Sequence, residues 1–182
     1  LDWSVELFQR YNEILKENGV ILYNISYSAE NNPNLMWLFV SEIINKTDFM
    51  VADCITWKKG SALPNNVSPN KLTRITEFVF VFCRKNEYKT FNTNKKVKSI
   101  SRTGQKYYEN IFNFFKARNN DGSNKLNKAT FSTEFCEKLI NIYLKKEYLV
   151  YDSFMGTGTT ANACKKLGLN YIGSELSENQ VK

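Results

Sequence analysis

The sequence predicts an α/β fold, a three-layer domain with a mixed, mostly parallel sheet. The first observation is a set of short apolar runs, rich in Val, Ile and Phe, that have the length of strands: residues 20–25, 49–57, 77–83 and 149–154. The second is that segments with helical spacing of apolar residues lie among these runs. The third is a glycine-rich turn that joins one such run to a helical segment. Alternating strands and helices are typical of helices packed on both faces of a sheet.

The elements follow one another in a regular order. Residues 4–16 carry apolar side chains at helical spacing, and Gly19 ends this first helix. The run at residues 20–25 is too short for a buried helix and suits a strand covered on both faces, as in a parallel sheet. Further helices are expected at residues 33–45 and 132–145. With 182 residues, the chain is long enough to bury an ordinary core.

Composition excludes several classes of chemistry. The chain contains no histidine, which removes Ser-His-Asp and Cys-His nucleophile systems and most catalytic zinc sites. No metal site is expected. The four cysteines form no C-x-x-C pair and are interpreted as buried thiols in a reducing cytosol. No run of about 18 apolar residues exists, so no membrane span is expected, and we expect a cytoplasmic protein.

Positive charge is concentrated in one segment. Residues 85–128 contain eleven Lys and Arg against three acidic residues, a local balance of +8, whereas the formal charge of the whole chain is +7. Folding does not require such a concentration, but a polyphosphate partner would favour it. A solvated basic loop is the alternative interpretation.

The strongest chemical signal is the segment D-S-F-M-G-T-G-T-T at residues 152–160, between a strand and a helix. Gly156 and Gly158 would let a ligand approach the backbone at the carboxyl end of the strand, and the following helix points its amides at the same place. Glu175 lies 19 residues after Gly156, at the end of the next expected strand, residues 171–174. There it can accept hydrogen bonds from both hydroxyls of a ribose. The pattern predicts a site for an adenosine-containing cofactor.

Two other nucleotide sites must be weighed against this one. The loop is not a phosphate-binding Walker loop, because no Gly-Lys-Ser/Thr follows. Gly156-x-Gly158-x-x-Ala161 does fit a dinucleotide fingerprint, so a nicotinamide enzyme is an alternative. Such domains usually begin with their glycine-rich unit, whereas here at least three strands precede it, and this order argues against a dehydrogenase.

The residues 152–160, followed by N-Y-I-G-S-E-L-S at residues 170–177, resemble the cofactor motif of amino-methylating DNA methyltransferases, the adenine-N6 and cytosine-N4 enzymes of restriction-modification systems and phages. Ser153 stands where the family usually has proline. The segment A-T-F-S at residues 129–132 resembles the motif that precedes the cofactor strand, although Asn127-Lys128 replaces its usual His-Pro. The resemblance implies a Rossmann-like, S-adenosylmethionine-dependent methyltransferase fold.

The resemblance also implies a division of the chain. Residues 1–85 would form part of the catalytic core, residues 86–128 a basic target-recognition insertion, and residues 129–182 the cofactor-binding part. This order is that of the β-type subclass, in which the catalytic Asp/Ser/Asn-Pro-Pro-Tyr tetrapeptide precedes all of these segments. The three prolines of the chain are not adjacent, so no catalytic residue is assigned. The tetrapeptide is expected upstream of Leu1, with the fold incomplete at both ends and the fragment alone inactive.

The resemblance assigns nine residues to S-adenosylmethionine: Asp152, Phe154, Gly156, Gly158, Thr159, Thr160, Glu175, Thr130 and Phe131. Glu175 would bind the ribose, and Asp152 would lie near the ammonium group. Thr159 and Thr160 would either bond the carboxylate of the ligand or cap the helix.

Double-stranded DNA is the expected partner. Phosphate contacts are assigned to six basic residues: Lys95, Lys96, Lys98, Arg102, Lys106 and Arg74. The aromatic residues of the same region are interpreted as local core rather than as base-stacking groups: Tyr107, Tyr108, Phe112, Phe114 and Phe115. DNA binding should therefore weaken steeply with added salt.

The predicted function is methyl transfer to the exocyclic N6 of adenine in DNA, in a bacterial or phage-encoded protein. The alternatives are a cytosine-N4 methyltransferase and a non-catalytic DNA-binding remnant. A methyltransferase acting on proteins or small molecules would share the glycine loop but would not need the basic segment.

Overall fold

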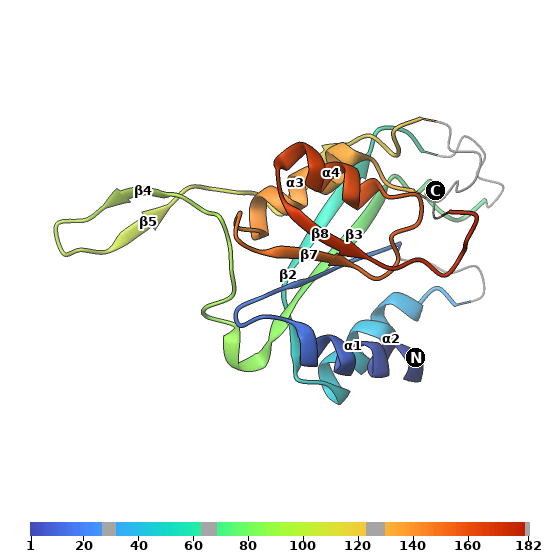
Figure 1. Ribbon diagram of the computed structural model, residues 1–182, viewed down its shortest axis with the longest axis horizontal. Coiled ribbons are helices and arrows are strands. Elements are labelled where there is room, and N and C mark those ends of the chain that lie inside the picture. Colours follow the sequence, from blue (N-terminus) through green and yellow to red (C-terminus); the bar gives the residue numbers. More distant parts are fainter. Residues whose placement is uncertain (27–31, 63–68, 123–129, 181–182) are drawn as a thin grey trace. The chain divides into compact units, whose positions relative to one another are not determined.

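The computed structural model describes residues 1–26, 32–62, 69–122 and 130–180, which form an α/β protein (Figure 1). The helices and strands follow in the order α1 (Asp2–Ile14), β1 (Ile21–Ile25), α2 (Leu35–Lys46), β2 (Phe49–Lys59), β3 (Thr76–Arg84), η1 (Lys85–Glu87), β4 (Val97–Ile100), β5 (Lys106–Tyr108), β6 (Phe114–Ala117), α3 (Thr133–Tyr143), β7 (Leu149–Asp152), α4 (Thr159–Leu167) and β8 (Asn170–Gly173). The chain divides into two compact units. The first comprises Leu1–Lys58, Ala62–Asn92 and Phe112–Lys116, and the second comprises Lys59–Ser61, Thr93–Ile111 and Ala117–Lys182.

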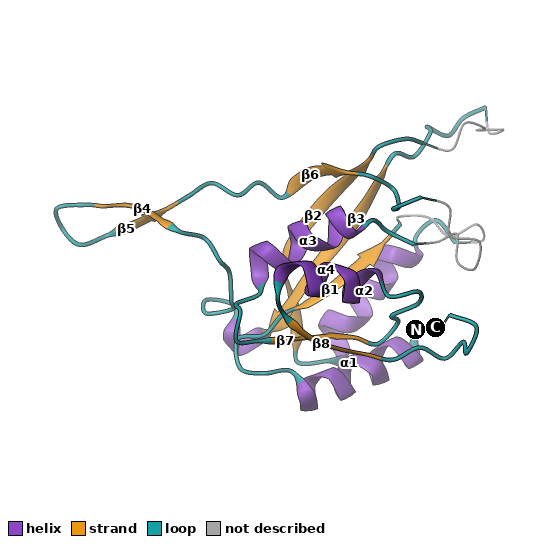
Figure 2. Cartoon of the chain, turned by 45° about the horizontal axis from the view of Figure 1, so that its top comes forward, coloured by secondary structure: helices purple, strands orange, loops and turns teal. Residues whose placement is uncertain are grey.

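The first unit is built on a sheet with the strand order β1-β3-β2-β6 (Figure 2). Both β1 and β2 pair antiparallel with β3, with Ile21 opposite Phe82 and Phe49 opposite Arg84. The expectation that residues 20–25 lie in a parallel sheet, covered on both faces, is therefore wrong. Every residue of β1 is only half-buried. Composition reveals that a run is apolar, but it does not reveal the direction of the strand that will pair with it.

An aromatic cluster forms the core of this unit. The ring of Phe8, from α1, is fully buried and lies 5.0 Å from Phe82 and 5.7 Å from Phe49, centroid to centroid. Phe39 of α2 contributes a further ring 5.9 Å from Phe8. Edge-to-face pairs such as these add to the stabilisation gained from burial alone. The two helices are therefore fixed to one sheet through their apolar faces.

The second unit contains the strand pair that flanks the glycine motif. β7 and β8 run parallel, with Leu149 opposite Asn170 and Asp152 opposite Gly173. Helices α3 and α4 bury a cluster made of Cys136, Ile140, Ala163 and Cys164, against which Val150 and Tyr171 pack. Small side chains on α4 allow the helices to approach closely. The helix expected after the glycine motif is confirmed and begins at Thr159.

The second unit also contains a hairpin in the basic segment, which the sequence pattern did not reveal. β4 and β5 pair antiparallel and join no other strand of the described residues. The interpretation of the aromatic residues in this region as local core is wrong for four of them, because their side chains are exposed: Tyr107, Tyr108, Phe112 and Phe114. Phe115 is half-buried.

Two expectations from the composition, no membrane span and no metal site, can be compared with the described part of the chain. None of its helices is both long and apolar enough to cross a membrane. Within the same residues, no group of three or more His, Cys, Asp or Glu could hold a metal ion. All four cysteines are free thiols; Cys54 is half-buried and the other three are buried.

Candidate cofactor site

The turn between β7 and α4 has a conformation that requires glycine. Gly156 and Gly158 both have positive φ, 54° and 85°, a region that side chains other than glycine adopt at a cost of roughly 1–2 kcal/mol. Gly158 is the N-cap of α4, and no described side chain caps the helix there. The amides of the first turn of α4 therefore have no partner within the helix and remain available to a polar ligand.

The carboxylate of Glu175 is directed at this turn. Its Oε2 accepts a hydrogen bond from the amide of Gly156 at 2.8 Å, and its Oε1 accepts one from the amide of Ser177 at 2.8 Å. The amide of Ser177, followed by that of Gly156, lowers the pKa of Glu175 below its ordinary value. An ionised carboxylate has about four acceptor positions, so two amides leave capacity for hydroxyl groups of a ligand. The predicted link between the acid and the glycine loop thus exists as a direct contact.

Asp152, at the end of β7, is held by two groups. One carboxylate oxygen accepts from the hydroxyl of Thr160 at 2.5 Å, and the other accepts from the amide of Phe154 at 3.0 Å. Thr160 is buried. Of the two roles considered for Thr159 and Thr160, capping of α4 is wrong, since Gly158 occupies the cap; a bond to the carboxylate of the ligand stays a prediction. Sequence spacing placed Thr160 at the site but could not show which acceptor its hydroxyl would choose.

The buried thiol of Cys136 lies next to the Asp152–Thr160 pair and contacts Thr160. Burial raises the pKa of Cys136 to about 12, and a hydrogen bond with Thr160 opposes only part of that effect. A thiol in such surroundings stays protonated and unreactive. Cys136 therefore belongs to the packing behind the site rather than to its chemistry.

Backbone hydrogen bonds continue between the two chain segments past the last paired residues of β7 and β8. The amide of Ser174 donates to the carbonyl of Asp152 at 3.0 Å, and the amide of Met155 donates to the carbonyl of Ser174 at 3.0 Å. The side chain of Met155 packs closely on Gly173, where a Cβ would lie 1.9 Å from Cε of Met155. Gly173 and Met155 were not predicted as site residues. The signal in the sequence that could have pointed to Gly173 was the Y-I-G triplet at residues 171–173, shortly before Glu175.

The remaining predicted cofactor residues differ in their surroundings. Phe154 is 60% exposed on the turn. Phe131 packs against the α3–α4 cluster, with its ring centroid 5.4 Å from that of Phe135. Thr130 is half-buried next to it. The structure thus shows Phe154 accessible to a ligand and Phe131 partly engaged in packing, and their contacts with a cofactor stay predictions.

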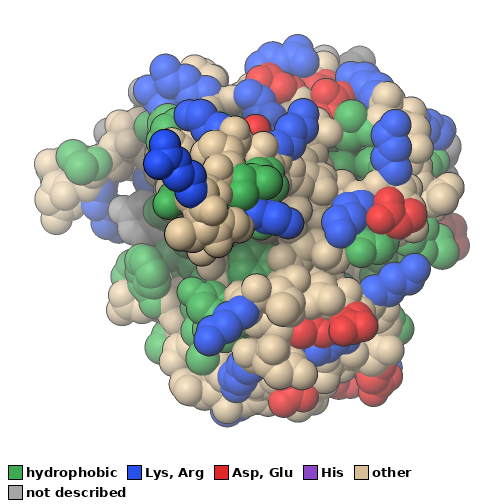
Figure 3. Space-filling model, turned by 90° about the vertical axis from the view of Figure 1, so that its left-hand side faces the viewer, with side chains coloured by type: hydrophobic (Ala, Val, Ile, Leu, Met, Phe, Trp, Pro, Cys, Tyr) green, Lys and Arg blue, Asp and Glu red, His purple; other side chains and the backbone are tan. Residues whose placement is uncertain are grey.

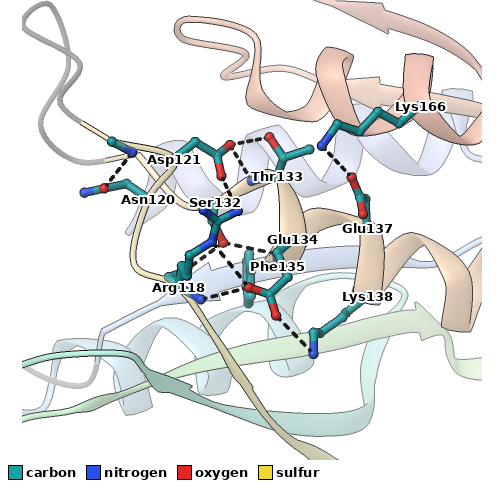
Figure 4. A network of polar contacts seen from close by, with 11 residues as sticks. Arg118, Asn120, Asp121, Ser132, Thr133, Glu134, Phe135, Glu137, Lys138 and Lys166 are labelled. Carbon is teal, nitrogen blue, oxygen red and sulfur yellow. Dashed lines mark hydrogen bonds and ion pairs between the residues drawn. The ribbon is translucent and has the colours of Figure 1, made fainter.

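A polar network fixes the start of α3, next to Thr130 and Phe131 (Figure 4). The buried hydroxyl of Ser132 accepts from the amide of Phe135 at 3.2 Å and donates to the carbonyl of Arg118 at 2.8 Å. The Asp121 carboxylate accepts from the amide of Thr133 at 2.8 Å. These contacts join the segment after β6 to the N-terminus of α3 and satisfy amides that a helix leaves open.

Glu134 completes this network. Its carboxylate accepts from the amide of Arg118 at 3.3 Å and forms ion pairs with the side chains of Arg118, at 3.7 Å, and Lys138, at 3.3 Å. The pKa of Glu134 is lowered, first by the hydrogen bond from the Arg118 backbone. Because these groups are largely exposed, they serve to orient the segment rather than to stabilise it strongly.

The structure brings five of the six predicted DNA-binding residues together. Exposed side chains on or beside the β4–β5 hairpin belong to Lys95, Lys96, Lys98, Arg102 and Lys106. Arg74 is also exposed but lies in the first unit, two residues before β3. The hairpin therefore forms a compact basic element, to which Arg74 does not belong.

A glycine loop between parallel strands, facing an acid at the end of the second strand, defines a nucleotide-cofactor site of an α/β protein. A family model of N6/N4-type DNA methylases matches residues 1–182. The chain belongs to this family of DNA methylases, as the sequence motifs predicted.

Curated relatives agree with this assignment. The type II methyltransferase M.MjaI of Methanocaldococcus jannaschii is 24% identical over 189 residues, which cover 95% of this chain and 62% of the relative. The type II methyltransferase M.BglII of Bacillus subtilis is 21% identical, with 100% of this chain and 54% of the relative covered. The chain thus spans little more than half the length of these relatives.

Solved structures have the same fold. The crystal structure of a complex of M1.HpyAVI with S-adenosylmethionine is similar with a TM-score of 0.69 and 27% identity, over 96% of this chain and 76% of that one. The cytosine-N4-specific PvuII DNA methyltransferase has a TM-score of 0.78 and 18% identity, over 99% and 67%. The predicted Rossmann-like methyltransferase fold is confirmed.

Proposed function

We propose that this chain is the S-adenosylmethionine-binding part of a DNA methyltransferase that modifies the N6 amino group of adenine. The observation that carries the proposal is the contact between Glu175 and Gly156 at the carboxyl ends of two parallel strands. A glycine turn with open helix amides fits a ligand that approaches the backbone closely, and an ionised acid beside it fits a ribose. Membership of the DNA methylase family supports S-adenosylmethionine as that ligand.

The chain's own residues would bind and orient the methyl donor. Glu175 would accept hydrogen bonds from the two ribose hydroxyls, and Asp152, held by Thr160, would face the ammonium group. Phe154 would cover the ligand from the exposed side of the turn. When bound, S-adenosylmethionine supplies an electrophilic methyl group. These residues would contribute by positioning that group, because in-line transfer depends on the alignment of the reacting atoms.

The acceptor base would be handled by other parts of the protein. Methylation of an amino group inside a duplex requires the base to leave the stack, at a cost of a few kcal/mol. The family's Asp/Ser/Asn-Pro-Pro-Tyr tetrapeptide would hold that base, and no residue of this chain is assigned that role. The basic residues of the second unit would bind the DNA backbone.

Calorimetry with S-adenosylmethionine tests the cofactor assignment. Replacing Glu175 by alanine should weaken binding at least about tenfold, since the variant lacks the carboxylate that would accept the ribose hydroxyls. Glu178→Ala, at an exposed position three residues away, serves as the control and should bind normally. Undiminished affinity in Glu175→Ala would refute the ribose assignment.

The reaction and its target base require the complete gene product. Sequencing that detects methylated bases, applied to DNA from cells expressing it, should find N6-methyladenine at a defined site. N4-methylcytosine instead would favour the alternative target. Absence of any methylation, with intact binding of S-adenosylmethionine and DNA, would favour the non-catalytic remnant.

A further inference from the structure

Helix α3 lacks the left-handed residue that closes many helices at the C-terminus. Its last residue is Tyr143, and the C-cap, Leu144, is extended, with φ −105° and ψ 130°. The amide of Leu144 donates to the carbonyl of Ile140 at 2.8 Å. The carbonyls that follow have no partner within the helix. Their partners must come from another part of the chain.

Asn94 supplies these partners from a distant segment. Its side-chain Nδ2 donates to the carbonyls of Asn141 at 2.9 Å and Leu144 at 2.6 Å. Its backbone amide donates to the carbonyl of Ile142 at 2.7 Å. Both hydrogens of the side-chain amide are thus used, and the negative end of the helix dipole gains donors. Because Asn94 and Asn141 are 47 residues apart, the contact joins two separate segments of the second unit.

Asn94 lies directly before the β4–β5 hairpin. Two residues further on, the amide of Glu109 donates to the carbonyl of Lys96 at 2.9 Å, and the Glu109 carboxylate accepts from the amide of Lys96, also at 2.9 Å. Among the described residues, β4 and β5 pair only with each other, and Figure 1 and Figure 2 show the hairpin extending away from α3 and α4. The attachment of its first strand to α3 therefore depends on Asn94.

The direction of the hairpin decides where its charge lies. Residues 95–108 contain five basic side chains and no acidic one. Figure 3 looks at the side of the molecule on which the hairpin lies and shows exposed Lys and Arg side chains there. A hairpin that could swing at its base would present this charge in many directions, whereas an anchored hairpin presents it in one.

The other end of α3 lies next to residues assigned to the cofactor. Thr130 and Phe131 directly precede Ser132, the N-cap of α3. The helix has 11 residues and is therefore about 16 Å long. It packs on α4 through Cys136 and Ile140, and α4 begins at the glycine turn. One rigid helix thus joins the base of the hairpin to the segment expected to bind the methyl donor.

We propose that Asn94 is a positioning residue for methyl transfer: by capping α3 from a distant segment, it fixes the direction of the hairpin relative to the methyl-donor site. The inference rests on the proposed function and adds to it a residue that contacts neither DNA nor cofactor. A duplex bound by the hairpin is then held in one geometry relative to the donor. In-line transfer is sensitive to this geometry, because a misplacement of about 1 Å can slow a reaction about a hundredfold.

The anchoring is tested by a distance measurement that needs no activity. Nitroxide labels are attached to the complete gene product at Thr103→Cys, at the tip of the hairpin, and at Lys165→Cys, exposed on α4, with the other accessible cysteines replaced by serine. Pulsed electron paramagnetic resonance should give a narrow distance distribution. Asn94→Asp should make it at least about twice as wide, because aspartate keeps the shape but has no hydrogen to donate. An equally narrow distribution in Asn94→Asp would overturn the proposal.

The role in the reaction is tested by separating rate from affinity. At saturating S-adenosylmethionine and duplex DNA, Asn94→Asp and Asn94→Ala should lower kcat at least about tenfold, with the Kd for S-adenosylmethionine within about twofold of wild type. The salt dependence of DNA binding should keep its slope, because no phosphate contact is lost. Asn94→Gln retains both donor hydrogens and should recover part of the rate.

Asn110→Asp is the matched control. Asn110 is exposed just after the second strand of the hairpin, and the substitution introduces the same negative charge as Asn94→Asp. It should change neither the distance distribution nor kcat. A fall in kcat equal to that of Asn94→Asp would assign the effect to charge and overturn the proposal.

These outcomes separate the two proposals. If the wild-type protein methylates DNA and Asn94→Asp keeps its kcat, the positioning role is refuted and the proposed function stands. If S-adenosylmethionine binding falls together with kcat in Asn94→Ala, the residue serves the fold alone and the positioning role is again refuted. If the wild-type protein binds duplex DNA but leaves it unmethylated, the proposed function fails, and the distance distributions alone decide whether Asn94 anchors the hairpin.

Discussion

At the scale of single residues, the site is organised by a few polar contacts around Asp152. Thr160 reaches Asp152 with its hydroxyl, and Asp152 in turn accepts the amide of Phe154. This pair sets the direction of the carboxylate before any ligand arrives. Thr160 is thus a positioning residue whose effect passes through Asp152.

Replacing Thr160 by valine keeps the shape and removes the hydroxyl. Because a charged acceptor loses one of its two partners, we expect the free energy of unfolding to fall by about 1–3 kcal/mol, and S-adenosylmethionine binding to weaken. Urea unfolding and calorimetry measure the two effects. Thr160→Ser retains the hydroxyl and should recover most of the binding; equal losses in both variants would mean that packing, not the hydrogen bond, matters.

Cys136 gives a prediction about pH. Its pKa of about 12 in the folded protein lies above the ordinary thiol value of 9.0 because the group is buried. Its contribution to stability is therefore complete below pH 9 and lost as pH rises towards 12. Iodoacetamide at pH 8.5 should not modify Cys136 in the native protein and should do so after unfolding, as followed by peptide mass spectrometry. Rapid native labelling would contradict this burial.

The residue-level prediction from sequence succeeded where spacing alone decides the outcome. Glu175 follows Gly156 by one helix and one strand, so any parallel pair must bring them to the same edge. The partner of Thr160 was not predictable, because a hydroxyl on the first turn of a helix can reach several acceptors. The close approach of Met155 to Gly173 depends on side-chain packing, which the motif does not encode.

At the scale of elements, both ends of α4 depend on glycines with positive φ. Gly158 begins the helix at 85° and Gly168 ends it at 67°. Alanine at either position should lower the free energy of unfolding by roughly 1–2 kcal/mol. Only Gly158→Ala should also weaken S-adenosylmethionine binding, because only that end faces the proposed site; calorimetry on the two variants provides a matched comparison. Equal binding losses would assign the effect to α4 stability alone.

Elements with strong local patterns were predicted, and elements without them were missed. The amphipathic helices and the runs rich in Val, Ile and Phe appear close to their expected positions. β4 and β5 were missed because every residue in them is exposed, so no apolar alternation marks them. The turn at Gly104 was the remaining signal. The antiparallel pairing of β1 could not be predicted for a different reason, since the choice of partner strand is a property of the whole sheet.

At the scale of the whole molecule, the β4–β5 hairpin is a local concentration of positive charge, with five basic residues and no acidic one in residues 95–108. Binding of duplex DNA should therefore depend on salt with a slope set by this hairpin: up to five phosphate contacts give a slope of log K against log salt of about −4 to −5. The double variant Lys96→Ala/Lys98→Ala should reduce its magnitude by about 2, measured by fluorescence anisotropy between about 50 and 200 mM salt. An unchanged slope would place the phosphate contacts elsewhere, Arg74 being the next candidate.

The division of the sequence into a core, an insertion and a cofactor part stays a prediction at this scale. The two compact units divide the chain differently, and the β4–β5 hairpin belongs to the same unit as the glycine turn. Contiguous segments were the natural assumption from sequence, because composition changes along the chain but contacts between distant segments leave no local trace.

Glu175 has a thermodynamic consequence. Its side chain is already ordered by amides from Gly156 and Ser177, so the ligand does not have to immobilise it. The entropic cost of fixing a flexible side chain on association is thereby avoided. The ribose of the methyl donor would thus bind to a carboxylate that folding of the chain has already fixed in position.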